Sequence, residues 1–263
     1  MKIGVFDSGI GGMTVLKELI KAFPDSQYVY VGDTANVPYG TKSSEKIREL
    51  CREATTYLKK RDLDLLVVAC NTASSLALNI FKNELHPVPV YGVVQPGVEA
   101  IVQSFSNLEY HQDRRLLILG TKATVNSQIY SREIRKHLQF NEISEQSCPL
   151  VVPMVEEGWV NHQVLVDTIS EYVKPYVSDP VPGVALLACT HYPWAQHVFE
   201  RCLPGWTIVN SAKAVVDFIR RENSKPINDK KKFEIEWIFT DPKAVTEVAL
   251  NDFKESLGII IHL

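Results

Sequence analysis

Short apolar, β-rich runs alternate along the chain with polar or glycine-containing turns and with helical patterns. Between the runs, Ser43–Lys60 and Thr124–Leu138 carry apolar residues at three- and four-residue spacing, which predicts amphipathic helices. The runs are too continuous for strands with one solvated face, so the alternation predicts a mainly parallel α/β fold. The predicted strands are Ile3–Phe6, Tyr28–Val31, Leu65–Ala69, Val90–Val94, Leu116–Leu119, Leu150–Val155, Ala185–Ala188 and Thr207–Val209.

Two parts of this pattern resemble each other. The segment KIGVFDSG is similar to LLILGTKAT, since each is a strand that ends in a polar turn before a helix. LDLLVVACNT is similar to GVALLACTHY, since each is a buried strand that ends in Ala-Cys and then polar residues. Look-alike strands also occur by chance in α/β chains, but these pairs come in the same order and at similar spacing. We therefore expect two α/β units of common plan, each with a mainly parallel sheet.

The expected domains divide the chain near its middle. The first covers residues 1–97 and the second residues 98–209, and the polar stretch Ser104–Arg114 is typical of a connecting loop. Residues 210–263 contain a further helix, strand and helix, which we expect to return to the first domain. Their predicted bounds are Ala212–Arg221, Phe233–Phe239 and Pro242–Leu257.

Composition and charge limit the kinds of protein that this chain can be. Its 263 residues suffice for one large domain or two smaller ones, and 45% apolar with 22% charged residues is a globular balance that excludes extensive disorder. The net charge of −3 is too small and mixed to indicate a nucleic-acid or anionic-membrane surface. No segment reaches the roughly 20 continuous apolar residues of a membrane span. The N-terminal run turns polar at Asp7, so no secretory signal is expected.

Cysteine usage indicates a reducing, cytoplasmic location. Five cysteines, an odd number, do not suggest a disulfide framework in a chain of this length. Cys51, Cys148 and Cys202 fit the common case of a small buried apolar side chain. Cys70 and Cys189 differ, because each stands where a buried strand meets a polar turn. A helix that begins there favours the thiolate, so we expect it to lower the pKa of the thiol.

Polar clusters follow four of the predicted strands. In an open parallel sheet, ligands bind beyond the carboxyl ends of the strands, where the free N–H groups of helix N-termini attract an anion. The glycines of the sequence GIGG (9–12) do not have the spacing of a dinucleotide-binding turn. They suit a tight turn near a small ligand, or close helix–strand packing with no ligand. The four clusters are Asp7-Ser8-Gly9, Cys70-Asn71-Thr72, Gly120-Thr121 and Cys189-Thr190-His191.

Two thiols in equivalent places of the two halves suggest a pair that faces across one cleft. Metal binding is an alternative, but Cys189 and His191 are the only close Cys/His pair in the sequence, which lacks a second pair with structural-zinc spacing. A redox disulfide is weakly supported because Cys-x-x-Cys is absent, and a cysteine hydrolase would leave Cys70 unused. Two-base proton transfer uses both thiols, since one removes a hydrogen α to a carboxylate and the other returns one to the opposite face. We expect no metal, flavin or pyridoxal phosphate.

Seven segments of the chain form a set of motifs that is specific in combination. They are FDSGIGGMTV (6–15), YVGDTANVPYG (30–40), VVACNTASS (67–75), YGVVQPG (91–97), GTKATVNSQIY (120–130), CPLVVPMVEEG (148–158) and LLACTHYP (186–193). Taken in order, they resemble the cofactor-independent glutamate racemases of the aspartate/glutamate racemase superfamily, over roughly the first three-quarters of the chain. The resemblance implies two pseudo-symmetric, mainly parallel-sheet α/β domains with the active site in the cleft between them, where D- or L-glutamate is held.

The resemblance also implies opposite stereochemical roles for the two thiols. Cys70 would act on the D-enantiomer with the help of Asp7, and Cys189 on the L-enantiomer with the help of His191 and Glu156. Asn71, Thr72 and Thr190 are also good caps for any helix, so sequence physics alone leaves their role open. The residues that would bind the amino-acid and carboxylate groups are Asp7, Ser8, Tyr39, Gly40, Asn71, Thr72, Thr121, Thr124, Thr190 and His191.

The family further implies a cytoplasmic isomerase that supplies D-glutamate for peptidoglycan synthesis. Its partner would be a small-molecule substrate, L- or D-glutamate, with no nucleic acid and no membrane, and a homodimer is an assembly that the family allows. Two alternatives stay open. One is a sibling racemase for aspartate, a hydantoin or another carboxylate, although the Cys-Thr-His sequence at 189–191 favours glutamate. The other is an α/β binding protein that kept its pocket and lost turnover.

Some positions differ from the family pattern. Ala188 precedes the second cysteine where the family usually has Gly, and its methyl group would crowd the turn. Asn210 stands where Asp is common, and the chain from Lys225 onward is only weakly similar. Because Glu157 is next to Glu156, the sequence leaves open which of the two carboxylates assists Cys189.

Overall fold

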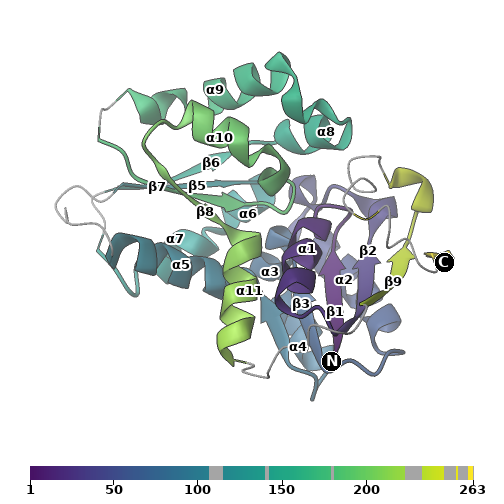
Figure 1. The fold of residues 1–263 in the computed structure, drawn as a ribbon. Helices are drawn as coiled ribbons and strands as arrows, with labels where there is room; N and C mark the ends of the chain where they lie inside the picture. The colour runs from purple at the N-terminus through teal and green to yellow at the C-terminus, as the bar shows by residue number, and fades with distance from the viewer. Residues whose placement is uncertain are drawn as a thin grey trace.

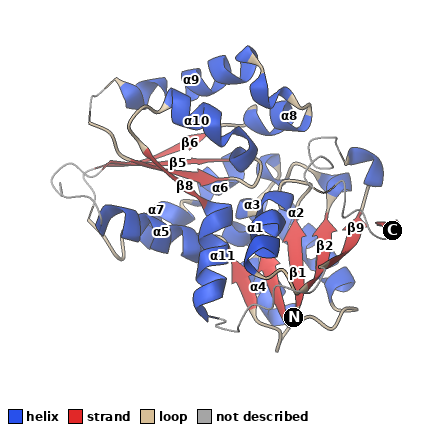
Figure 2. Cartoon of the chain, viewed as in Figure 1, coloured by secondary structure: helices blue, strands red, loops and turns tan. Residues whose placement is uncertain are grey.

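Two parallel β-sheets with helices on both faces form the computed structural model of the chain (Figures 1 and 2). The structure describes residues 1–106, 115–139, 142–178, 181–222, 233–245, 253 and 260–262. The strands are β1 (Lys2–Asp7), β2 (Gln27–Gly32), β3 (Leu65–Val68), β4 (Val90–Gly92), β5 (Arg115–Gly120), β6 (Glu142–Ser147), β7 (Val184–Ala188), β8 (Thr207–Asn210), β9 (Glu234–Phe239) and β10 (Ile260–His262). The α-helices are α1 (Met13–Ala22), α2 (Ser44–Leu58), α3 (Asn71–Leu76), α4 (Leu78–Glu84), α5 (Val94–Ser106), α6 (Lys122–Ser127), α7 (Ile129–Ile134), α8 (Val151–Glu156), α9 (Gln163–Val177), α10 (Gln196–Cys202) and α11 (Ser211–Glu222).

The two sheets repeat one strand order. The larger sheet runs β10-β9-β2-β1-β3-β4 and the smaller runs β6-β5-β7-β8, and all the pairs are parallel. In each sheet the first strand of the unit lies between the second and the third. β1 pairs with β3 just as β5 pairs with β7, so the segments that end at Cys70 and Cys189 occupy equivalent places. The prediction of two α/β domains with parallel sheets is confirmed.

Alternating side chains of the central strands bury both faces of each sheet. In β1, Val5 packs in the cluster that contains α1 and α11, while Phe6 packs in the cluster that contains α2 and α4. In β5, Leu117 faces α8, α9 and α10, whereas Ile118 faces α5 and α7. Strands covered on both faces need continuous apolar sequences, which is why these runs could be read from the sequence.

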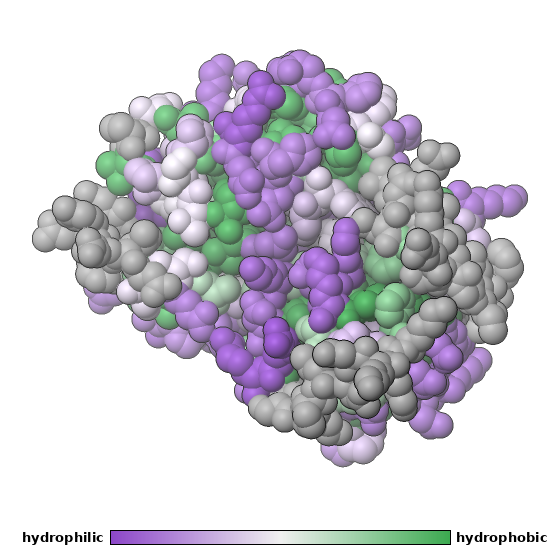
Figure 3. Space-filling view, in the orientation of Figure 1, coloured by the Kyte–Doolittle hydropathy of each residue, from purple (hydrophilic) through white to green (hydrophobic). Residues whose placement is uncertain are grey.

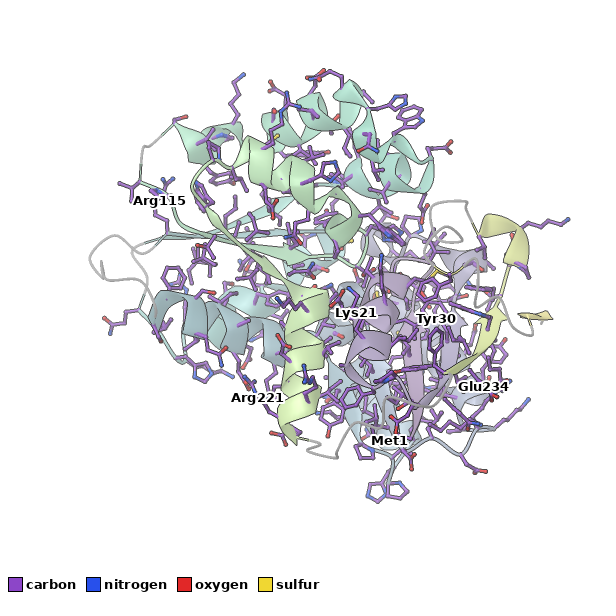
Figure 4. All side chains as sticks on the ribbon, in the orientation of Figure 1. Met1, Lys21, Tyr30, Arg115, Arg221 and Glu234 are labelled. Atoms are coloured by element: carbon purple, nitrogen blue, oxygen red, sulfur yellow. The ribbon has the colours of Figure 1, made fainter. Side chains whose placement is uncertain are left out.

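Helix α11 links the two domains. It follows β8, the last strand of the smaller sheet, and packs against both α1 and α5 (Figure 1). Near its far end, Arg221 forms an ion pair with Glu99 of α5 at 2.7 Å (Figure 4). β9 then pairs with β2 of the larger sheet, so the helix and strand predicted over Ala212–Arg221 and Phe233–Phe239 are confirmed as α11 and β9.

The prediction of a strand over Leu150–Val155 is wrong. These residues lie in α8, and the strand that joins the smaller sheet is β6, just before them. β6 has the polar sequence EISEQS because it is the edge strand of its sheet. In α8 the valines 151, 152 and 155 are buried at helical spacing, and Pro153 lies in the first turn, where its missing N–H costs nothing.

Three further expectations change at element ends. The helix predicted over Thr124–Leu138 is two short helices, α6 and α7, because Gln128 between them adopts a left-handed conformation with φ of 50°. The run Val90–Val94 ends as a strand at Gly92, and the start of the loop predicted over Ser104–Arg114 is the last turn of α5. Of the helix predicted over Pro242–Leu257, the structure shows a 3₁₀ turn at Pro242–Ala244, and most of the rest lies outside the described residues.

Amphipathic helices put their polar faces outside. In α2, residues 47, 50, 51, 54 and 58 are buried, and Ser43 caps the helix by accepting a hydrogen bond from the backbone N–H of Lys46. Figure 3 shows hydrophilic side chains spread over the visible face of both domains. Among the described residues, no helix combines the length and the apolar composition that crossing a membrane requires.

The break at Gln128 yields a stability prediction. A left-handed conformation costs a residue with a Cβ roughly 1–2 kcal/mol, while glycine adopts it freely but has more backbone entropy to lose. We expect Gln128→Gly to raise the free energy of unfolding by about 1 kcal/mol, measured by urea denaturation. Gln128→Ala, which keeps the Cβ, should give no such gain. A glycine variant that is less stable than the parent would contradict the assignment of strain to this residue.

Candidate active site

The carboxyl ends of the two sheets meet around one small cavity. β1, β3, β5 and β7 end beside it, and each is followed by one of the predicted polar clusters. The sulfur-bearing residues Cys70 and Cys189 both line this cavity, whose volume is about 20 Å³. The lining residues are Ser8, Val37, Pro38, Tyr39, Gly40, Cys70, Asn71, Thr72, Thr121, Val152, Cys189, Thr190 and His191.

Cys70 is the residue before α3 and is almost fully buried. Its sulfur accepts a hydrogen bond from the backbone N–H of Ala73 at 3.4 Å and lies 3.5 Å from the Ser8 hydroxyl. Burial raises the pKa of this thiol to about 12, the negative charge of Asp7 adds to the rise, and these two hydrogen bonds offset only part of it. The expectation that a helix N-terminus lowers the pKa is therefore wrong for Cys70, because desolvation of the thiolate outweighs one N–H donor at a short helix.

Asp7 lies at the end of β1 with no exposed surface. Its carboxylate accepts hydrogen bonds from the backbone N–H of Gly9 at 3.0 Å and from the Thr190 hydroxyl at 3.2 Å. Burial raises the pKa of this carboxyl, and the nearby charge of His191 opposes the rise. Asp7 lies just behind the cavity lining. Through its bond with Thr190, it connects the first domain to the turn that carries Cys189.

The buried His191 pairs with the partly exposed Glu156 beside Cys189. Nε2 of His191 lies 2.9 Å from Oε1 of Glu156, while Glu157 is exposed and caps the end of α8. Burial lowers the pKa of His191, but its interactions with Cys189 and Glu156 outweigh burial and raise the pKa to about 10. The imidazole is therefore held as a cation next to Cys189. Of the two adjacent carboxylates, Glu156 is the one in contact with His191.

Three threonine hydroxyls lie close together at the cavity, two of them in its lining. Thr72 Oγ1 is 3.0 Å from that of Thr121 and 3.2 Å from that of Thr124, and the last two are 3.1 Å apart. Thr72 belongs to α3 of the first domain, whereas Thr121 caps α6 of the second. Gly40 packs directly against Thr121, since a Cβ at position 40 would lie 2.4 Å from the Thr121 Cβ. Two helix N-termini and three hydroxyls make this a place for a carboxylate.

The remaining predicted residues also lie at the cavity. The Asn71 amide nitrogen lies 3.4 Å from the Ser211 hydroxyl, and Thr190 and Ser8 are bonded as described above. The Tyr39 hydroxyl donates its one hydrogen to Asp33 at 2.6 Å, so this hydrogen is not available to a ligand. The structure thus brings all the predicted residues together. Asp7, Thr124 and Glu156 stand just outside the lining and contact residues of it.

Sequence reasoning missed several residues at the site. Val37, Pro38 and Val152 line the cavity, and they lay inside the quoted motifs without being singled out because they carry no polar group. Tyr130 and Ser211 both contact Asn71. Tyr130 closes the motif GTKATVNSQIY, which was a signal, whereas Ser211 could be found only from its place in space.

The positions that differ from the family pattern have local explanations. Asn210 accepts hydrogen bonds from the backbone N–H groups of Ala212 and Lys213, and so caps α11. Ala188 is fully buried, pairs with Gly120 in the neighbouring strand, and packs in the apolar cluster that contains Ile118 and Tyr130.

The other cysteines lie away from the cavity. Cys51 and Cys148 are packed in the apolar clusters around α2 and α8, and Cys202 is half-buried with its sulfur 3.3 Å from the Ser170 hydroxyl. In the described part of the chain, no three His, Cys, Asp or Glu side chains are grouped so that they could hold a metal ion. The cavity thus combines two thiols, their acid and base neighbours, and the hydroxyl and amide groups described above.

Comparisons with known proteins match most of the chain. The family model described as Asp/Glu/Hydantoin racemase matches residues 3–219. A protein of Persephonella marina named glutamate racemase is 41% identical over 223 residues, which are 85% of this chain and 83% of that protein. The glutamate racemase of Aquifex aeolicus is also 41% identical, over 85% of each chain.

A solved structure agrees with the sequence comparison. Glutamate racemase from Francisella tularensis subsp. tularensis SCHU S4, in complex with D-glutamate, superposes with a TM-score of 0.85 at 27% identity. The superposition covers 100% of this chain and 97% of that chain. The family match includes both cysteines of the cavity and their neighbours. This chain therefore belongs to the Asp/Glu/hydantoin racemase family.

Proposed function

We propose that this protein interconverts L- and D-glutamate by proton transfer at the α-carbon between two cysteines, without a cofactor. The observation that carries the proposal is that Cys70 and Cys189 line one cavity with opposite electrostatic neighbours. Membership of the family supports it, as do the names of the relatives and the D-glutamate bound in the Francisella structure. The proposed catalytic residues are Cys70, Cys189 and His191 of the cavity lining, with Asp7 and Glu156 just behind it.

The two thiols have neighbours of opposite charge. His191, whose pKa is raised to about 10, interacts with Cys189. Cys70 keeps its proton, because burial and the charge of Asp7 raise its pKa to about 12. We therefore assign Cys70 as the proton donor and Cys189, beside the imidazolium, as the proton acceptor for L-glutamate.

The reaction of L-glutamate then follows in two steps. The Cys189 thiolate takes the α-hydrogen as a proton, and the electron pair of the C–H bond stays on the α-carbon, stabilised by the adjacent carboxylate group. The Cys70 thiol gives its proton to the opposite face of that carbon, which forms D-glutamate. Cys189 is left as a thiol and Cys70 as a thiolate, so the next D-glutamate reacts in reverse. Asp7 and His191 lie where they can exchange protons with the thiols and restore the starting state.

Glutamate must widen the cavity in order to bind. A volume of about 20 Å³ holds roughly one water molecule, far less than an amino acid of ten non-hydrogen atoms. Thr72 and Thr121 come from different domains, and so do Gly11 and His191, where a Cβ on the glycine would lie 2.4 Å from Nδ1. We propose that the domains separate to admit the substrate and close again over it. Ser8, Tyr39, Gly40, Asn71, Thr72, Thr121, Thr124 and Thr190 are its proposed ligands.

The domain division and biological setting belong to the same proposal. The domains would be residues 1–97 with 210–263, and residues 98–209, a division that falls within α5. We place the protein in the cytoplasm, where it would supply D-glutamate for peptidoglycan synthesis. A homodimer and the absence of a nucleic-acid partner stay predictions.

An isotope-exchange assay tests the activity. The purified protein is incubated with D-glutamate in heavy water, in the presence of a chelator and without pyridoxal phosphate. Optical rotation should fall to zero while deuterium enters the α-position. Exchange with D-aspartate instead of D-glutamate would point to a sibling racemase. Glutamate binding without exchange would identify a binding protein and would contradict the proposal.

Removal of either thiol should stop racemisation. Cys70→Ala and Cys189→Ala each leave one face of the α-carbon without a proton carrier, so we expect kcat to fall by at least about 100-fold. Cys202→Ala is the matched control, because Cys202 is half-buried outside the cavity and its loss should leave kcat unchanged. Circular dichroism checks that the variants are folded. Turnover near the parent rate in either cavity variant would remove that cysteine from the mechanism.

The His191–Glu156 pair predicts a change in pH dependence. Glu156→Gln removes a charge that raises the pKa of His191, so the imidazole should lose its proton at lower pH than in the parent protein, where the pKa is about 10. The alkaline limb of kcat/KM for L-glutamate should therefore move to lower pH. Glu157→Gln, which alters the exposed neighbour, should leave the profile in place. An unmoved profile in Glu156→Gln would show that this pair does not control ionisation of the site.

A further inference from the structure

A chain of hydrogen bonds passes from one domain to the other and back beside the two thiols. The Tyr130 hydroxyl, on α7, donates to Oδ1 of Asn71 at 2.6 Å. Nδ2 of Asn71 donates to the Ser211 hydroxyl at 3.4 Å, and Ser211 donates to the carbonyl of Leu187 at 2.9 Å. Asn71 follows Cys70 in sequence, and Leu187 precedes Cys189 by two residues. These hydrogen bonds therefore connect the turn that follows Cys70 with the strand end that precedes Cys189.

The last bond of this hydrogen-bonded series, from Ser211 to the Leu187 carbonyl, fixes the direction of the others. A backbone carbonyl can only accept, so Ser211 must spend its one hydrogen on Leu187. The Ser211 oxygen then faces Asn71 with a lone pair and requires an N–H from it. A reversed amide would set two oxygens against each other. The arrangement thus needs Oδ1 of Asn71 on the side of Tyr130, where the phenol supplies the donor.

Tyr130 is well placed to hold that orientation. Its side chain is 1% exposed, and it packs so closely under α5 that a Cβ on Gly97 would lie 3.2 Å from its ring. Burial raises the pKa of the phenol, and the charges of Cys189 and Cys70 raise it further. The hydroxyl therefore keeps its proton as a donor. Its ring has little room to move, so the position of its oxygen is set by the second domain.

We infer that Tyr130 is a positioning residue for substrate binding, which fixes the Asn71 side chain so that its amide nitrogen faces Ser211 and the cavity. Asn71 lines the cavity, and its NH₂ group carries two hydrogens, of which Ser211 takes one. The second hydrogen is available to an acceptor of the ligand, such as a carboxylate oxygen. Without the phenol, the buried Oδ1 of Asn71 has no hydrogen-bond donor. The side-chain amide then rotates away from its bond with Ser211, and Oδ1 turns toward the cavity. The kinetic part of this inference rests on the proposed racemase activity.

Kinetics of Tyr130→Phe test the inference. The ring and its packing remain, and only the hydroxyl is lost. We expect KM for both enantiomers of glutamate to rise roughly 10-fold, the size of effect that follows when a buried acceptor loses its donor, with a smaller change in kcat. The matched control is Tyr28→Phe, which removes a buried hydroxyl that donates to the carbonyls of Leu19 and Phe23 in the first-domain core. Tyr28→Phe should lose stability and keep its KM, and a KM for Tyr130→Phe equal to the parent value would overturn the inference.

A double-variant cycle separates positioning from a general structural effect. If Tyr130 acts through Asn71, then Tyr130→Phe added to Asn71→Ala should raise KM by less than about 2-fold beyond Asn71→Ala alone. A merely structural role predicts that the two effects multiply, because the loss of packing or stability would not depend on the Asn71 side chain. Multiplied effects would therefore overturn the inference.

Nuclear magnetic resonance gives a readout that needs no substrate. The side-chain NH₂ signals of Asn71 in ¹⁵N-labelled protein are identified by their loss in Asn71→Ala. Their exchange with solvent should be faster in Tyr130→Phe than in the parent, and unchanged in Tyr28→Phe. If the parent neither racemises nor binds glutamate, the proposed function fails while this measurement still decides the role of Tyr130. Equal exchange rates in the parent and in Tyr130→Phe would overturn it.

Discussion

The carboxyl ends of two separate parallel sheets must approach each other closely for two thiols to share one cavity. At two points where the domains touch, the approach depends on glycine. A Cβ at Gly11 would lie 2.4 Å from the His191 ring, and a Cβ at Gly40 would lie equally close to Thr121. A side chain at either position would force the facing residue of the other domain to shift. The proposed chemistry therefore depends on these glycines as well as on the sulfur atoms.

The repeated strand order places the thiols in equivalent positions, but their neighbours differ. Cys70 has a buried carboxyl group behind it, at Asp7, while Cys189 has the His191–Glu156 pair beside it. A carboxylate opposes ionisation of a nearby thiol, and an imidazolium favours it. A symmetric site would give both thiols the same electrostatic surroundings. In the proposed mechanism, the departure from symmetry is what distinguishes a proton donor from a proton acceptor between two identical side chains.

Much of the fold could be predicted from the sequence because its central strands are covered on both faces and so have continuous apolar runs. Prediction failed where a strand is not covered on both faces, or where a run of buried apolar residues belongs to a helix. β6 is a polar edge strand and was missed, and the valines of α8 were taken for a strand in its place. The break at Gln128 has no glycine to signal it. The site residues were found through motifs, whereas the raised pKa of Cys70 depends on how deeply the domains bury it, which no local pattern records.

Helix α11 contacts both the site and α5. Ser211 at its first turn bonds to Asn71 and Leu187, and Arg221 near its other end pairs with Glu99 of α5. Tyr130 belongs to the second domain and Asn71 to the first, so a movement that opens the cavity must stretch or break the bond between them. Under the proposed opening and closing of the domains, the Asn71 amide would therefore be oriented only in the closed state. The proposed ligand next to Cys70 would then be in place in the same state that brings Cys189 to the cavity.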